Sequence, residues 1–245
     1  MNPLKNCPFL STSRRRLAIT SAAFTLIELL VVIAIIAALA AFAVPALTSA
    51  LTRGQMTGTL NNARQFYLAG YQMALDGSSN SDPTLTWPGD DQNSSLDLKL
   101  YCAKLIKNDY LKAGDLTKLL SAPGSACTVT ATGPDANGDY TVTYASGTPA
   151  LKVYKVKDAD SANTIFATTK NYVYDTALAS ANSPFGDKGF VVVRKGGDAS
   201  ILRKNNAVAP SGQEAAFQSS VGKRPGDVDG ASGVSAGDSA VTLTP

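Results

Sequence analysis

The chain has 245 residues, 44% of them hydrophobic, and a formal net charge of +3, which leaves room for one packed domain with additional segments. It contains no histidine, which excludes Ser–His–Asp and Cys–His catalysis and removes the commonest zinc and copper ligand. Four basic residues and no acid precede Phe24, so the charge of +3 becomes −1 when those four are removed, and no basic stripe remains to predict nucleic-acid binding.

Residues 1–23 have the composition of a targeting leader, with a basic cluster at Arg14–Arg16 followed by small residues. Next comes an apolar run, residues 24–44, in which only Thr25 and Glu28 are not apolar. As a helix this run would be about 32 Å long, enough to cross the hydrocarbon core of a bilayer. The preceding arginines predict a single-pass protein with a cytoplasmic N-terminus and an exported remainder.

Glu28 is unusual in this run, because a carboxylate costs on the order of 2.5–3.5 kcal/mol near the centre of a membrane span. It either reaches water near the interface or has a function and a partner. The residues Phe24-Thr25-Leu26-Ile27-Glu28 and the apolar run resemble the prepilin processing motif of type IV pilins and pseudopilins. The resemblance implies that a prepilin peptidase cuts between Ala23 and Phe24 and methylates the new amine. It also implies that Glu28 serves assembly by neutralising the amine of a neighbouring subunit. Ala23 stands where the family usually has glycine.

A rival interpretation is a discarded export signal. The arginine cluster loosely resembles a twin-arginine signal, and residues 38–40 and 41–43 are Ala-x-Ala cleavage patterns. The rest would then be a soluble exported binding protein. Glu28 argues against this alternative, and so does a helical pattern that continues beyond both patterns.

The helical pattern extends through residues 45–76. Pro45 stands where many members of the family have a helix-kinking proline, and a proline inside a helix removes one backbone hydrogen bond. Beyond it, apolar or small residues recur at helical spacing, at Met56, Leu60, Ala63, Tyr67, Tyr71 and Ala74. A helix over residues 24–76 would be about 80 Å long. It resembles the family's first helix, with residues 24–44 in the membrane and 45–76 packed on a head.

Residues 77–204 predict a globular α+β head. Trp87, in a Pro/Gly turn, is expected to cover the core. Short helices are expected at residues 96–107 and from Asp115 to Pro123. Strands are expected at residues 128–132, 140–144, 151–157, 164–168, 171–175, 189–195 and 199–203. The glycines at 196 and 197 predict a hairpin between the last two. A long helix followed by strands predicts a pilin-like fold, with an antiparallel sheet on the helix.

Cys102 and Cys127 both follow the apolar run, whereas Cys7 would leave with the leader. An even pair in an exported domain favours a disulfide, and two buried free thiols are the alternative.

Residues 205–245 are rich in Ala, Gly, Ser and Pro and predict a flexible tail. Within it Asp227, Asp229 and Asp238 would fill positions 1, 3 and 12 of a calcium loop, but position 5 is Ala231. We favour a solvated segment over a calcium site and expect no cofactor.

The pattern and the resemblance together predict a non-enzymatic structural subunit, a pseudopilin of a type II secretion-like filament. A type IV pilus or DNA-uptake pilin is the alternative within the family. The implied partners are copies of the chain, other pseudopilins, prepilin peptidase, the inner-membrane assembly platform and membrane lipid, and no nucleic acid. The implied location is the inner membrane, with the head periplasmic, and then the filament.

Overall fold

A computed structural model describes residues 24–245, which divide into two compact units at Leu47. The predicted leader, residues 1–23, and Ala23 with it, lies outside the described residues. Helix α1 (Leu26–Asn80) begins in the first unit and ends in the second. The second unit adds antiparallel β-sheets and short helices to it. The structure thus confirms the α+β class with a long N-terminal apolar helix.

The first unit consists of the apolar part of α1. This helix is long and apolar enough to cross a membrane by length and composition, and none of its most apolar window is buried. Pro45 lies inside the helix, and the kink there stays a prediction.

The part of α1 within the second unit presents one face to the core. The residues buried on it are Met56, Thr59, Ala63, Phe66, Tyr67, Ala69, Gly70, Met73, Ala74 and Gly77. The predicted face is therefore largely correct, but Leu60 is half-buried and Tyr71 is exposed. The helix also ends at Asn80 instead of residue 76. Gly77 continues the helix because it packs on the following loop, where an added Cβ would lie 1.7 Å from the Leu85 carbonyl oxygen.

Three short helices follow: α2 (Leu98–Lys107), η1 (Ala113–Asp115) and α3 (Leu116–Leu119). Asp97 caps α2, since its carboxylate accepts the backbone N–H of Leu100 at 2.7 Å. Asp115, where the sequence predicts that the second short helix begins, ends η1 and occupies the N-cap position of α3, but its side chain makes no capping hydrogen bond.

The strands form two antiparallel sheets. β1 (Cys127–Thr132) and β2 (Thr141–Gly147) form a hairpin. β3 (Leu151–Val153), β4 (Ile165–Thr169), β5 (Phe190–Arg194) and β6 (Ala199–Leu202) form a sheet in sequence order. The predicted hairpin between β5 and β6 is correct, and Gly197 there has a φ of +87°, which favours glycine.

One predicted strand, residues 171–175, is wrong. The segment is a turn whose alternating tyrosines are buried anchors. The Tyr172 hydroxyl donates to the Ala207 carbonyl at 3.1 Å, and the Tyr174 hydroxyl donates to the Gly222 carbonyl at 3.0 Å. The alternation of tyrosines in the sequence, which resembles a strand pattern, thus reflects two side chains that bind the C-terminal segment.

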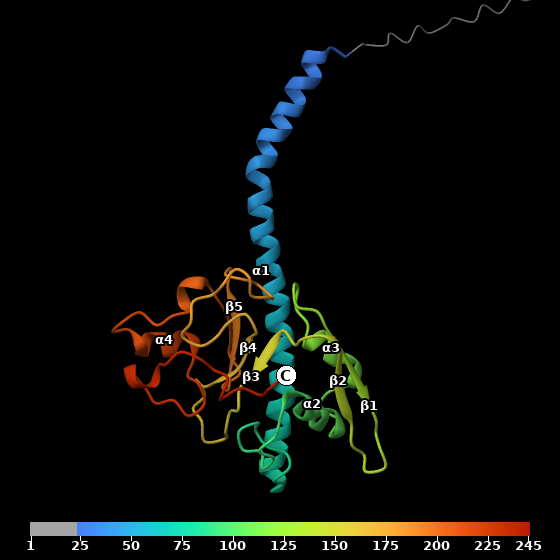
Figure 1. Cartoon of the computed structure of the whole chain (residues 1–245), viewed down its shortest axis with the longest axis vertical. Helices are drawn as coiled ribbons and strands as arrows, with labels where there is room; N and C mark the ends of the chain where they lie inside the picture. The colour runs from blue at the N-terminus through green and yellow to red at the C-terminus, as the bar shows by residue number, and fades with distance from the viewer. Residues whose placement is uncertain (1–23) are drawn as a thin grey trace, which may run out of the picture. The chain divides into compact units, whose positions relative to one another are not determined.

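Aromatic rings join α1 to the four-stranded sheet. Phe166 of β4 lies 5.3 Å from the Tyr67 ring and 6.4 Å from the Phe66 ring, measured between centroids. Trp87 lies 6.0 Å from Phe166 and is 5% exposed, so it covers the core as predicted. Figure 1 shows this sheet on one side of the second half of α1, and α2, α3 and the β1–β2 hairpin on the other.

The expected flexible tail, residues 205–245, is instead folded onto the head, and this corrects the prediction. It contains η2 (Lys204–Asn206, at its start), α4 (Glu214–Val221) and η3 (Ala231–Gly233), in orange to red in Figure 1. Few apolar side chains hold it, and each is nearly fully buried: Ala207, Phe217, Val221 and Leu243. Backbone bonds add to them, because the Leu243 N–H donates to the Val153 carbonyl at 2.8 Å at the edge of β3. Residues 205–245 therefore pack on the head although few of them carry large apolar side chains.

The predicted Cys102–Cys127 disulfide is absent from the structure. Both residues are free cysteines, 0% and 1% exposed, and they pack within the apolar core. Burial raises the pKa of both thiols above the ordinary value, which disfavours the reactive thiolate.

We therefore expect two slow-reacting thiols in the mature chain. Native protein should resist iodoacetamide, and denatured, unreduced protein should take one label at Cys102 and one at Cys127. Peptide mass spectrometry measures both. A linked peptide and no label would show that the exported protein forms the disulfide after all.

Candidate processing and assembly site

The first turn of α1 is closed by three reciprocal hydrogen bonds between Thr25 and Glu28. The Glu28 carboxylate accepts the Thr25 backbone N–H at 2.8 Å and the Thr25 hydroxyl at 2.7 Å. In return, the Glu28 N–H donates to the Thr25 hydroxyl oxygen at 3.3 Å. This is a capping box, for which Thr-x-x-Glu is the sequence signal. The sequence carries that signal at Thr25-Leu26-Ile27-Glu28.

The surroundings of this pair are apolar and uncovered. Phe24 is 81% exposed, and every large apolar side chain from there to Leu51 is at least 48% exposed. The Glu28 carboxylate borders a hollow of about 410 Å³ whose other residues are Phe24, Ile27, Val31 and Val32. A continuous apolar surface of this kind needs a cover of lipid or protein.

Comparison with protein families identifies this segment. Residues 20–44 match the family model described as the prokaryotic N-terminal methylation motif. The match supports a type IV pilin-like or pseudopilin protein. Comparison with curated proteins and with solved structures gives no match. The pilin-like motif belongs to structural proteins, and together with the single apolar N-terminal helix it points to anchoring in a membrane.

The matched range contains Phe24, Glu28 and the first helical turns, and it ends just before Pro45. Their roles in cleavage, assembly and kinking are predictions that follow from the motif. Polymerisation with other pilin-type subunits and processing by prepilin peptidase are implied at the same level.

The three aspartates of the calcium candidate do not share a site. Asp227 binds Arg224 through both carboxylate oxygens, at 2.9 and 3.0 Å. Asp229 pairs with Lys223 at 2.9 Å and is 91% exposed. Among residues 24–245, no three acidic or thiol side chains are placed to hold a metal ion.

We expect no calcium binding by these residues, because Asp227 and Asp229 are each engaged by a cation and Asp238 points elsewhere. Calorimetric titration of the mature protein in detergent should give no heat of binding up to millimolar calcium. A micromolar affinity that is lost in Asp227→Ala would contradict this.

Asp238 belongs instead to a buried polar cluster that sequence reasoning missed. It is 8% exposed and accepts hydrogen bonds from Lys152 at 2.5 Å and from the Tyr154 hydroxyl at 3.0 Å. Lys152 also donates to the Tyr172 carbonyl. Burial lowers the pKa of Lys152, and the hydrogen bond to Asp238 opposes that shift. The cluster fixes the C-terminal segment to β3.

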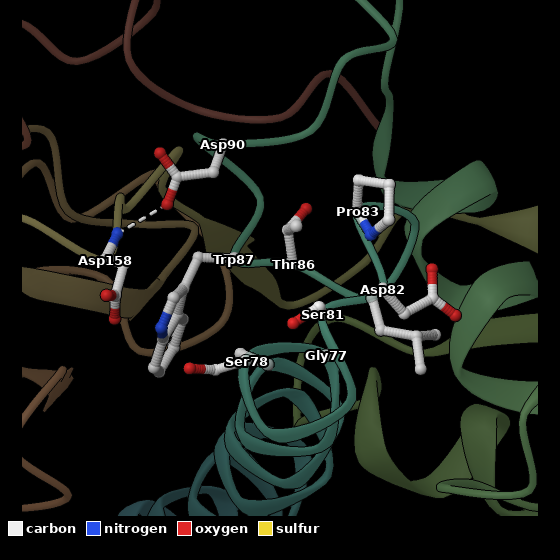
Figure 2. Close-up of a pocket in the computed structure, with 11 residues that line it drawn as sticks. Gly77, Ser78, Ser81, Asp82, Pro83, Thr86, Trp87, Asp90 and Asp158 are labelled. Atoms are coloured by element: carbon white, nitrogen blue, oxygen red, sulfur yellow. Dashed lines mark hydrogen bonds between the residues drawn. The ribbon is translucent and has the colours of Figure 1, made fainter.

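A second hollow, of about 310 Å³, lies where α1 ends (Figure 2). Each of its three carboxylates has a neighbour of opposite polarity, and that of Asp158, which is 83% exposed, lies 3.9 Å from the Lys195 ammonium. The Asp90 carboxylate accepts the Asp158 N–H at 2.5 Å, and Asp82 accepts the Thr84 N–H at 2.8 Å. Trp87, also labelled in Figure 2, lines the hollow but is buried. The hollow is therefore explained by the packing of the loop after α1.

Proposed function

We propose that the chain is a pseudopilin, a structural subunit of a type II secretion-like filament that is processed by prepilin peptidase and polymerises through α1. One observation carries the proposal: the methylation motif coincides with an apolar helix that has no buried residue in its apolar window. Such a helix needs lipid before assembly and other copies of itself afterwards.

The mechanism we propose is mechanical. Before cleavage the basic leader keeps the N-terminus in the cytoplasm, and the head is exported to the periplasm. Cleavage before Phe24 exposes a new amine. In the filament this ammonium enters an apolar environment, where it needs an opposite charge. Glu28 of the adjacent subunit supplies that charge, which sets the register of each subunit added by the assembly platform.

Deletion of the gene tests the assignment to secretion. We expect exported proteins to accumulate in the periplasm, and a plasmid copy should restore their release into the medium. Normal secretion together with loss of surface pili or of DNA uptake would assign the chain to a pilus instead. The measurement is the extracellular protein fraction, with pilus counts and transformation frequency taken on the same strains.

A further inference from the structure

A basic hollow lies at the start of the second unit. Its volume is about 600 Å³, and three cations line it: Arg53 of α1, Lys188 of the loop before β5, and Arg203 after β6. Met56, Ile201 and Leu202 supply its apolar wall. No carboxylate is among the residues that line the hollow.

Across residues 24–245, no carboxylate lies within ion-pair distance of the three cations of this basic hollow. Lys188 is nevertheless near enough to Asp187 to add to the hydrogen bond from Lys204 in lowering the pKa of that carboxyl. The neighbouring Asp187 is paired with Lys204 at 2.9 Å. The Lys188 ammonium donates to the Thr52 hydroxyl at a long distance, 3.4 Å. Three unpaired cations around an open hollow favour an anionic ligand.

The sequence places Arg53, one of the residues that line this hollow, shortly after the predicted membrane span. No charged residue occurs between Glu28 and Arg53. That uncharged stretch would be about 36 Å long as a helix, slightly more than the hydrocarbon thickness of about 30 Å. If α1 spans the bilayer as predicted, Arg53 is the first charge on the far side, where lipid headgroups would lie.

We propose that the basic hollow binds the phosphate of an anionic phospholipid headgroup. The guanidinium groups of Arg53 and Arg203 offer forked donors to phosphate oxygens, and Lys188 adds a point charge. Ile201, which is 38% exposed, lies beside them and suits the glycerol and upper acyl region. The contact would hold the head of an unassembled subunit at the membrane surface. The proposal rests on membrane anchoring of α1 and not on the kind of filament formed.

Native mass spectrometry of the full chain in detergent tests this proposal. Phosphatidylglycerol and phosphatidylcholine are titrated separately, and the adduct fractions are compared. We expect a clear preference for phosphatidylglycerol in the wild type. Each basic residue near an anionic surface contributes on the order of a five-fold change in affinity, so Lys188→Gln/Arg203→Gln should lose roughly 25-fold. The matched control, Lys112→Gln/Lys118→Gln, removes two exposed lysines outside the hollow and should keep the preference.

Further measurements distinguish a phospholipid from other ligands of the basic hollow. Equal adducts of the two lipids, or an unchanged preference in the double variant with a wild-type melting midpoint, would overturn the proposal. So would displacement of the lipid by millimolar inorganic phosphate, because the site would then be one for free phosphate. If the variant keeps its lipid adducts but loses cross-links between neighbouring subunits in sheared filaments, the hollow is a protein interface instead. Filament formation and lipid preference are measured separately, so failure of one does not imply failure of the other.

Discussion

Replacing Glu28 by leucine is expected to leave the protein as processed, membrane-embedded monomer and to abolish filaments. Insertion should be unaffected, because leucine makes the run more apolar. Assembly should fail, because the amine of Phe24 is buried without its partner. Breaking one partner of a buried ion pair costs about 3–5 kcal/mol, which is roughly 10² to 10³-fold or more in the equilibrium constant for each added subunit.

The capping box complicates this experiment, because leucine also removes the hydrogen bonds of Glu28 to Thr25. Two variants separate the effects. Glu28→Gln keeps an oxygen that can accept those bonds but removes the charge, and we expect it to fail as leucine does. Thr25→Ala keeps the charge and loses a cap worth about 1 kcal/mol, and we expect it to assemble. The measurement is sheared-filament yield against the membrane pool. Normal filaments from Glu28→Gln would show that the carboxylate only caps the helix.

Replacing Asp238 by alanine is expected to destabilise the head by about 3–5 kcal/mol, because it leaves Lys152 buried without its carboxylate. The matched control is Asp229→Ala. Its carboxylate is 91% exposed, although the side chain of its partner Lys223 is only 13% exposed, and a carboxylate that stays in water should contribute less than about 1 kcal/mol. Urea unfolding of the mature protein in detergent measures both. The fluorescence of Trp87, the single tryptophan, reports on the core.

Two further results would confirm that the loss of stability in Asp238→Ala comes from the unpaired Lys152. The pKa of Lys152 is already lowered by burial and falls further without Asp238, so the folded variant favours the neutral amine. The defect should therefore shrink as pH rises from neutral towards the ordinary lysine pKa of about 10.4, where the amine loses its charge in the unfolded chain as well. Lys152→Met/Asp238→Leu removes both charges and should recover most of the stability. A defect in Asp238→Ala no larger than in Asp229→Ala would show that the pair does not hold the C-terminal segment.

Local patterns predicted the parts of the fold that local forces determine. The helical stripe of α1 located Met56, Ala63, Tyr67 and Ala74 on the buried face, since helix geometry fixes that face. The glycines before Asp198 marked the β5–β6 turn, because Gly197 has a positive φ that glycine tolerates best. The processing motif is also local, and it alone gave Phe24 and Glu28.

Long-range contacts were beyond such patterns. Lys152 and Asp238 are 86 residues apart in sequence, and nothing near either one indicates the other. The C-terminal segment reads as a flexible tail because its few anchors, Phe217 among them, are isolated between small polar residues. Cys102 and Cys127 are expected from the sequence to form a disulfide because they are an even pair in a predicted exported domain, yet each is a free cysteine in an apolar core. Amino-acid composition gives the average apolar content of a segment, whereas its packing depends on a few buried side chains.

The N-terminus of the membrane-bound protein tests the central claim most directly. Peptide mass spectrometry of protein purified from membranes should find a chain that begins at Phe24 with a methylated amine. That result requires both the cleavage after Ala23 and the retention of the apolar helix. A chain that begins near Val44 or Pro45 would show that the apolar run is a discarded signal, and would contradict the pilin-like account.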